Sequence, residues 1–318
     1  MLVTRGFLIT VGNMIDKPPL FHAGVHCGTD LDGKISAVIF VHEIAKGNIH
    51  PAGFALILFA VIQVYPIIWV ILQSIKTTEE LTNLSALSLP SSLYTGHFKK
   101  ALEVSTIPRS FLNSTIVAVV TLTLEVAICC PFAFAVRKLR WKGGEKVFNF
   151  VLLGMMIPVF CCLIPMFKVF NTLGLRNTYL SLILPQVGFS IPIVTYMYRS
   201  FMDYVPDSVL ESAYIDGATT FQTFMRIVVP MVRNTTVTVL TYRFIYVWNE
   251  FTYANTFLTD RAMRTLPITL KDFTGEFGLV EWGPTFAAIV MAVTPTLILY
   301  FILSKNVIEG MALGAVKS

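Results

Sequence analysis

Long apolar runs alternate with short polar segments along the chain. A helix needs about 20 mainly apolar residues to cross a bilayer. The sequence predicts six such helices, at about residues 53–72, 111–136, 147–170, 179–201, 227–248 and 285–303. This pattern predicts an all-α, polytopic membrane protein whose transmembrane part covers residues 51–318.

The third and fourth predicted helices each contain two prolines, which are Pro158, Pro165, Pro185 and Pro192. Proline removes a backbone donor, and membrane helices tolerate it where neighbouring groups or water satisfy the freed carbonyl. The prolines therefore predict kinks, which either serve packing or lie beside a transport pathway.

Residues 1–50 do not continue the pattern of long apolar runs. Their run at Leu8–Val11 is too short to span a membrane or to form the core of a signal peptide. His22, His26 and Cys27 have the side chains of metal ligands, but no second cluster accompanies them, so we predict no metal site. We expect a weakly ordered cytoplasmic tail. A start codon chosen too far upstream is the alternative explanation.

Charge predicts which side of the membrane each segment faces. The segment between the second and third predicted helices holds five basic residues and one acid, which are Arg137, Lys138, Arg140, Lys142, Lys146 and Glu145. Such an excess of Lys and Arg is typical of cytoplasmic loops. Counting helices from this loop places both termini in the cytoplasm, together with the polar segment of residues 207–226 between the fourth and fifth helices.

That second polar segment is too polar to lie in lipid, and we predict two short helices in it. Ser208 and Glu211 have the spacing of a capping box for the first helix. Thr219 and Gln222 have the same spacing for the second. Gly217 lies between them, where a left-handed residue would end the first helix. The first helix has an apolar face made of Val209, Leu210, Ala213 and Tyr214. An amphipathic helix at the membrane edge can fill a groove on a soluble partner.

This segment resembles the EAA loop of ABC-importer membrane subunits, whose pattern is roughly E-A-A-x-x-D-G-A followed by an isoleucine and Leu-Pro. The matching residues are Glu211, Ala213, Asp216, Gly217, Ala218, Ile227 and Pro230. Ser212 replaces the middle alanine, and Val229 stands where leucine is usual. The run Ile-Asp-Gly-Ala is similar to the carbohydrate-uptake branch, which includes the maltose and glycerol-phosphate permease subunits. Shorter matches occur at Ser74–Thr77, Leu89–Pro90, Asn113–Ser114 and Trp248–Phe251.

The resemblance implies the fold of a type I ABC importer transmembrane domain, in which residues 207–226 dock into an ATPase subunit and couple its closure to the membrane domain. It also implies the partners, namely a second permease subunit, two ATP-binding subunits and an extracytoplasmic solute-binding protein. ATP and Mg would bind to the partner subunits, and this chain would bind no cofactor. The protein would lie among lipid in the plasma membrane. The alternative is that residues 207–226 are an ordinary connector between two membrane helices.

Composition excludes several other classes of protein. The chain is 55% hydrophobic and 14% charged, whereas a soluble domain has about a quarter charged residues. Its net charge of +5 is spread between the apolar runs, so we expect no nucleic-acid partner. The motif G-x-x-x-x-G-K-[ST] is absent, so the chain lacks that device for holding ATP phosphates. G-x-S-x-G and H-E-x-x-H are absent too, and we expect no enzyme activity. The adjacent cysteines, Cys129–Cys130 and Cys161–Cys162, should behave as small hydrophobic residues.

Two charged residues lie inside predicted membrane helices. Glu125 is in the second helix and Arg243 in the fifth, and each costs about 3 kcal/mol at the centre of a bilayer. They should therefore face protein or water, either as groups that line a transport cavity or as a structural ion pair. The remaining alternative is that the predicted helix boundaries are misplaced by one turn. Around Arg243 are Tyr246, Asn249 and Glu250, a combination of an aromatic face, an amide and a carboxylate that suits a sugar. Nearby Trp248 could instead belong to an aromatic belt at the outer interface.

The sequence therefore predicts a permease subunit that forms half of the pathway of an ATP-driven importer for a sugar or oligosaccharide. Because Arg243 could bind an anionic group, glycerol phosphate or another polyol is the alternative cargo. An ion-coupled secondary transporter, with Glu125 and Arg243 as a relay, is the alternative from a different class. An intramembrane enzyme would need paired catalytic groups at one depth, and the sequence shows no such pair.

Overall fold

The structure is a computed structural model that describes residues 51–139, 141–273 and 280–315. The chain divides into two units, Met1–Val64 and Tyr65–Ser318. The described part of the first unit is the beginning of helix α3 (Pro51–Ser74). The predicted tail at residues 1–50 and its candidate metal ligands lie outside the described residues.

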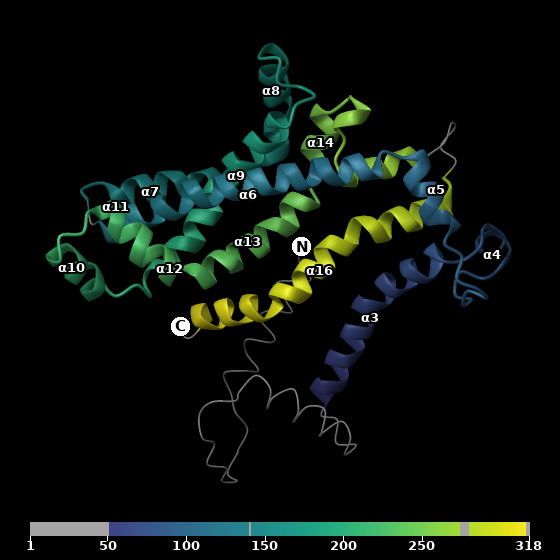
Figure 1. Cartoon of the computed structure of the whole chain (residues 1–318), viewed down its shortest axis with the longest axis horizontal. Helices are drawn as coiled ribbons and strands as arrows, with labels where there is room; N and C mark the ends of the chain where they lie inside the picture. The colour runs from purple at the N-terminus through teal and green to yellow at the C-terminus, as the bar shows by residue number, and fades with distance from the viewer. Residues whose placement is uncertain (1–50, 140, 274–279, 316–318) are drawn as a thin grey trace, which may run out of the picture. The chain divides into compact units, whose positions relative to one another are not determined.

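The described elements of the second unit are all helical (Figure 1). After α3 come α4 (Thr78–Asn83), α5 (Gly96–Val104), α6 (Ile107–Lys138), α7 (Gly144–Leu152), η1 (Leu153–Met156), α8 (Val159–Thr172), α9 (Leu180–Met202), α10 (Asp207–Ile215), α11 (Thr220–Thr223), η2 (Phe224–Val228), α12 (Val229–Met231), α13 (Arg233–Trp248), α14 (Thr252–Phe257), η3 (Arg261–Met263), α15 (Leu266–Thr269), η4 (Leu270–Phe273) and α16 (Trp282–Ala315).

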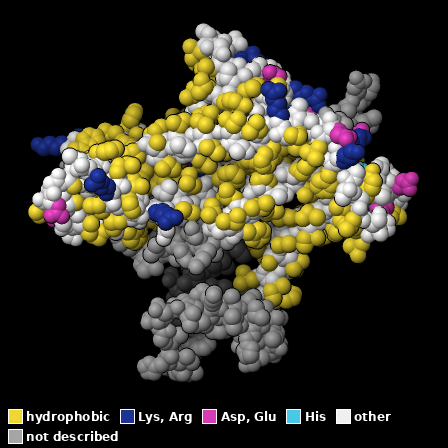
Figure 2. Space-filling view, viewed as in Figure 1, with side chains coloured by type: hydrophobic (Ala, Val, Ile, Leu, Met, Phe, Trp, Pro, Cys, Tyr) yellow, Lys and Arg dark blue, Asp and Glu magenta, His cyan; other side chains and the backbone are white. Residues whose placement is uncertain are grey.

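Four helices in the described ranges are long and apolar enough to cross a membrane. They are Gly53–Ser74, Ile107–Lys138, Leu180–Met202 and Trp282–Leu303. These segments correspond to the first, second, fourth and sixth helices that the sequence predicts. Figure 2 shows hydrophobic side chains over the middle of α6, α13 and α16, with charged side chains gathered toward the helix ends.

The third predicted helix is broken. The axis of α7 and η1 meets that of α8 at an angle of 93°, and the two pieces together are long enough for one further span. Ile157, just before Pro158, is extended with ψ 114°, because a proline disfavours the helical conformation of the residue before it. Pro158 is itself extended and forms the N-cap of α8. The proline therefore ends one helix and begins another, instead of kinking a continuous one.

The fifth predicted helix, at about residues 227–248, is also divided. The segment begins with the π-helix η2 and the short α12, and α13 starts only at Arg233 and has 16 residues. Pro230 has no N–H to donate to the carbonyl four residues earlier. The backbone before it adopts the wider π-helix, in which the Val229 N–H donates to the Phe224 carbonyl.

Helices α6 and α9 lie side by side and carry both hydrophobic clusters of the second unit (Figure 1). One cluster packs their first halves against α14, α15 and α16. The other packs their last halves against α10 and the start of α13. Cys129 and Cys130 are buried in this second cluster, as the sequence predicts for small hydrophobic residues, whereas Cys161 is exposed.

The segment of residues 249–273, after α13, is fixed to the beginning of α6. The Asn113 side chain donates from Nδ2 to the carbonyls of Ala262, at 3.0 Å, and Arg264, at 2.8 Å. Its Oδ1 accepts a hydrogen bond from the Tyr179 hydroxyl at 2.8 Å. Asn113, which is 2% exposed, thus joins α6, α9 and this segment.

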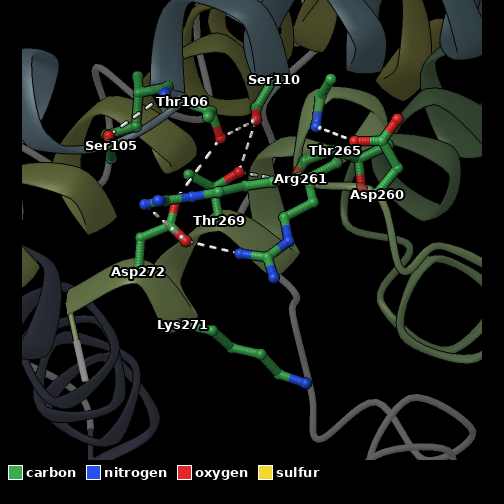
Figure 3. A network of polar contacts seen from close by, with 12 residues as sticks. Ser105, Thr106, Ser110, Asp260, Arg261, Thr265, Thr269, Lys271 and Asp272 are labelled. Atoms are coloured by element: carbon green, nitrogen blue, oxygen red, sulfur yellow. Dashed lines mark hydrogen bonds and ion pairs between the residues drawn. The ribbon is translucent and has the colours of Figure 1, made fainter. Parts of the chain in front are cut away.

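Asp272 forms a second connection between the segment of residues 249–273 and the beginning of α6 (Figure 3). Its carboxylate is 3% exposed and lies 2.6 Å from an Arg264 nitrogen and 3.3 Å from an Arg261 nitrogen. The Thr106 hydroxyl donates to its other oxygen at 3.5 Å. Figure 3 shows Arg261, and Thr106 from the turn before α6, directed toward Asp272.

We expect Asp272→Asn to lower the free energy of unfolding by about 2 kcal/mol, because Arg264 loses a hydrogen bond to a charged group and Arg261 loses an ion pair. Thermal unfolding of the detergent-solubilised protein, followed by circular dichroism, measures this. The control is Glu103→Gln, since Glu103 and its partner Lys99 are mostly exposed, 3.9 Å apart. Equal unfolding temperatures for the two variants would contradict the connecting role of Asp272.

Candidate functional site

The segment of residues 207–226 folds as two helices joined at a glycine, as the sequence predicts. Gly217 has φ +82°, in the left-handed region that favours glycine. The Ala218 N–H donates to the Ala213 carbonyl at 2.9 Å, and the Gly217 N–H donates to the Tyr214 carbonyl at 3.1 Å. This pair of bonds is a Schellman motif, which satisfies carbonyls at the end of α10 and turns the chain sharply.

The capping predictions have different outcomes. Thr219 and Gln222 form the predicted capping box, with the Gln222 N–H donating to Thr219 Oγ1 at 3.2 Å and the Thr219 N–H to Gln222 Oε1 at 2.9 Å. The box predicted for Ser208 and Glu211 is wrong. Pro206, with φ −66° and ψ 134°, takes the N-cap position, so Ser208 already lies inside the helix, where its hydroxyl cannot cap the first turn.

The predicted apolar face of α10 is split between two surroundings. Leu210 and Ala213 are buried and Leu210 packs in the hydrophobic cluster of α6 and α9, while Val209 and Tyr214 are exposed. Two further apolar side chains face outward, Ile215 at 85% exposure and Phe221 at 72%. Of the residues that match the EAA pattern, Glu211, Asp216, Gly217 and Pro230 are exposed, Ala218 and Ile227 are half-buried, and Ala213 is buried. The segment is thus anchored on one side and presents an apolar and acidic surface on the other.

The last turn of α6 fixes the start of α10. Lys138 is 8% exposed, and its Nζ donates to the Val205 carbonyl and to Asp207 Oδ1, both at 2.7 Å. Arg137, beside it, forms an ion pair with Asp203. The basic loop and the segment of residues 207–226 therefore lie at the same end of the helices, which agrees with the predicted topology.

Lys138 is a functional candidate that sequence reasoning missed. In the sequence it contributes only to the charge of its loop. Its partners are 67 and 69 residues away, and no local pattern signals such a contact.

The structure brings Glu125 and Arg243 together. Arg243 Nη2 donates to Glu125 Oε1 at 2.7 Å, and its Nε donates to Oε2 at 3.0 Å. The two side chains are 1% and 11% exposed. This bidentate ion pair joins the middle of α6 to α13. Because each charge is already neutralised by the other, neither group is well placed to bind a charged ligand.

The other residues predicted near Arg243 point in several directions. The Tyr246 ring is 56% exposed and its centre lies 5.8 Å from the Arg243 guanidinium. Asn249 is exposed and donates to the Ile245 carbonyl at 2.8 Å. Glu250 accepts hydrogen bonds from the N–H groups of Tyr253, at 2.6 Å, and Ala254, at 3.1 Å. Burial raises the pKa of Glu250, while these donors act in the opposite direction. Tyr246 and Asn249 can meet a ligand, whereas Glu250 caps α14.

Trp248 does not belong to an aromatic belt. Its indole is 4% exposed and donates to the Ala292 carbonyl at 3.0 Å. The ring packs on Phe244 and Phe111, with centres 5.3 Å and 5.4 Å apart. Since tertiary packing covers it, the belt interpretation is wrong.

The groups described above suit binding. Within residues 51–139, 141–273 and 280–315, no three His, Cys, Asp or Glu side chains are grouped so as to hold a metal ion. The exposed surface of α10 and α11 offers apolar and acidic contacts to a protein, and α13 offers an aromatic ring and an amide.

Comparisons with known proteins agree with this picture. Residues 127–310 match the family described as binding-protein-dependent transport system inner membrane component. The probable ABC transporter permease protein YurM of Bacillus subtilis is 32% identical over 82% of this chain and 86% of its own length. The diacetylchitobiose uptake system permease protein NgcG of Streptomyces coelicolor is 30% identical over 81% of this chain and 86% of its own.

A solved structure shows the same fold. It is that of a bacterial ABC transporter involved in the import of the acidic polysaccharide alginate, with a TM-score of 0.69 and 20% identity, covering 87% of this chain and 99% of that one. This likeness supports the type I ABC transporter fold. The family match covers more than half of the chain, and we conclude that the chain belongs to the family of binding-protein-dependent transport system inner membrane components, the permease subunits of ABC transporters.

Proposed function

We propose that this chain forms one half of the transmembrane pathway of an ATP-driven importer for a sugar or oligosaccharide. A relative named for diacetylchitobiose uptake supports a carbohydrate cargo. In this proposal the chain crosses the plasma membrane six times, with both termini in the cytoplasm. A second permease subunit, two ATP-binding subunits that hold ATP and Mg, and an extracytoplasmic solute-binding protein complete the transporter.

The observation that carries the proposal is the geometry of the segment of residues 207–226, which we call the coupling loop. The turn at Gly217 presents Ile215 and Phe221 to solvent, where an ATP-binding subunit can contact them. The opposite side of α10 is anchored through Leu210 and Lys138. Because the loop is exposed on one side and attached to α6 on the other, it can transmit a movement of the ATP-binding subunit to α6.

The intramembrane ion pair bears on the cargo. Because Glu125 already neutralises Arg243, this arginine is a poor binding partner for an anionic cargo. The pairing therefore supports an uncharged sugar over glycerol phosphate. In this proposal Glu125 and Arg243 hold α6 against α13, and Tyr246 and Asn249 are the candidate contacts with cargo.

The first prediction from this proposal concerns how Gly217 couples ATP hydrolysis to uptake. Gly217→Val places a β-branched residue at φ +82°, which costs roughly 1–2 kcal/mol of backbone strain. An added Cβ meets no atom within 4 Å, so the rest of the fold should survive. We expect normal membrane insertion, ATP hydrolysis that cargo no longer stimulates, and a large loss of uptake in proteoliposomes.

Gly174→Val is the matched control, since Gly174 also has positive φ, +65°, and open space around it, but lies between α8 and α9. It should keep its coupling. Cross-linking from Ile215→Cys tests whether the loop reaches the ATP-binding subunit. Normal uptake by Gly217→Val, or no cross-link during active transport, would count against the coupling role.

The second prediction concerns Lys138 as a positioning residue. Lys138→Met keeps the length of the side chain and removes both hydrogen bonds to the start of α10. We expect the maximal uptake rate to fall about tenfold, because hydrogen bonds of a charged group are worth roughly 1.5–3 kcal/mol each. The cargo concentration at half-maximal uptake should not change, since the cargo contacts are elsewhere. Lys142→Met, an exposed lysine of the same loop, is the control, and equal rates for the two variants would contradict the role.

The third prediction separates a structural ion pair from a proton relay. Arg243→Met alone leaves the Glu125 charge buried, which costs about 3–5 kcal/mol, so we expect little folded protein. The double variant Glu125→Leu with Arg243→Met replaces the pair by apolar side chains and should regain both folding and ATP-driven uptake. A relay in an ion-coupled secondary transporter would instead leave the double variant folded but inactive. Uptake assays on equal amounts of inserted protein distinguish the two.

A further inference from the structure

Within the second unit, the loop between α4 and α5 lies at the opposite end from α10 and exposes four leucines (Figure 1). Leu84, Leu87, Leu89 and Leu93 are 51%, 73%, 74% and 79% exposed. We call residues 84–93 the leucine loop. Such exposure of large apolar side chains on one short loop is a sign of an interaction surface.

Polar side chains of α3 hold this loop in place. Trp69 Nε1 and Gln73 Nε2 both donate to the Ala86 carbonyl, at 2.9 Å and 2.7 Å. They are four residues apart and so lie on one face of α3. Lys76 Nζ donates to Ser88 Oγ at 3.2 Å. Lys76, 1% exposed, belongs to the match at Ser74–Thr77, which the proposed transport function does not explain.

Glu80 in α4 fixes the other side of the loop. Its Oε1 accepts hydrogen bonds from the Ser91 N–H, at 2.8 Å, and from Ser91 Oγ, at 2.5 Å. Its Oε2 accepts from the Thr77 N–H at 2.8 Å, within the capping box that begins α4. The Ser91 hydroxyl and the Thr77 N–H lower the pKa of Glu80 to about 2, so the carboxylate remains charged and bonded at any physiological pH.

These bonds set the depth of the loop. Helix α3 ends at Ser74, and a helix rises about 1.5 Å per residue, so Trp69 lies roughly 7.5 Å before that end. Since Ala86 is bonded to Trp69 and Gln73, the loop folds back beside the last turns of an apolar helix long enough to span a membrane. Leu87, next to Ala86, therefore lies level with the last turns of α3, and the rest of the loop is bonded to Lys76 and Glu80, just after its end.

Composition fits that depth. No Asp, Glu, Lys or Arg occurs in residues 81–98, between Glu80 and Lys99. Charged groups are costly inside a bilayer, so their absence over this length suits a segment in contact with lipid. Two indoles are close by, since Trp69 and Trp282 both pack on Phe286 with ring centres 5.4 Å and 5.8 Å away. Tryptophan is enriched at the boundary between lipid and water.

We propose that the leucine loop is a lipid-binding surface, which inserts Leu87 and Leu89 among the acyl chains of the outer leaflet beside α3. The assignment to the outer leaflet rests on the proposed function, because that function places the coupling loop in the cytoplasm. Lipid fits better than a protein partner, because protein interfaces rely on Trp, Tyr and Arg and contain little Leu and Ser at their energetic centres. The loop offers leucine and serine, as residues 84–93 read LSALSLPSSL.

Photo-cross-linking tests this proposal. Benzoylphenylalanine replaces Leu87 or Leu89, one at a time, in the full-length chain in vesicles of phosphatidylethanolamine and phosphatidylglycerol. After irradiation, mass spectrometry of the peptide is expected to show the mass of one phospholipid added. The yield should approach that at Ile68, an exposed apolar position of α3, and exceed severalfold that at Glu103, an exposed charged position of α5.

The same variants are then irradiated in native membranes that contain the whole transporter. Lipid adducts there as well support the proposal. A protein adduct at Leu87 and Leu89, on a second copy, another subunit or a solute-binding protein, overturns it. Absence of lipid adducts while Ile68 gives them overturns it too. Neither readout uses uptake or ATP hydrolysis, so failure here would leave the proposed transport function unaffected.

Discussion

The structure depends on polar groups that α6 satisfies at three levels along its length. Near its beginning Asn113 holds the segment that follows α13, in the middle Glu125 binds Arg243, and at its end Lys138 binds the start of α10. A buried polar or charged group without a partner is costly, so each of these contacts stabilises this arrangement of the helices. One helix thereby fixes the positions of elements that lie far apart in the sequence.

This arrangement holds the coupling loop rigidly against α6. The loop is short and mostly exposed, and alone it would be as mobile as other surface connections. Lys138 and the buried Leu210 join it to α6, and the left-handed turn at Gly217 fixes the angle between its two helices. A movement of the ATP-binding subunit against the exposed side of the loop is therefore transmitted to a membrane helix. A permease subunit that is driven by a separate ATP-hydrolysing partner needs such a connection.

At the other end of the protein, polar side chains act as supports for apolar ones. Gln73, Lys76 and Glu80 are nearly buried, and their bonds hold a loop whose leucines face outward. The Glu250 carboxylate likewise accepts a hydrogen bond from the first turn of α14. Glu250, which the sequence offers as a ligand contact, thus serves instead to shape the segment that follows α13.

The sequence by itself determined the features that depend on neighbours along the chain. The periodic apolar runs predict the long helices, and Gly217 and the pair Thr219 and Gln222 predict the turn and the cap of the coupling loop, because these are contacts within one or two turns. Tertiary structure alone decided which distant groups meet. The sequence left an ion pair of Glu125 and Arg243 as one alternative, and the fold decided it by bringing them together across 118 residues. The fold also brings the leucine loop back along α3, because buried polar groups have no solvent and must find partners within the protein.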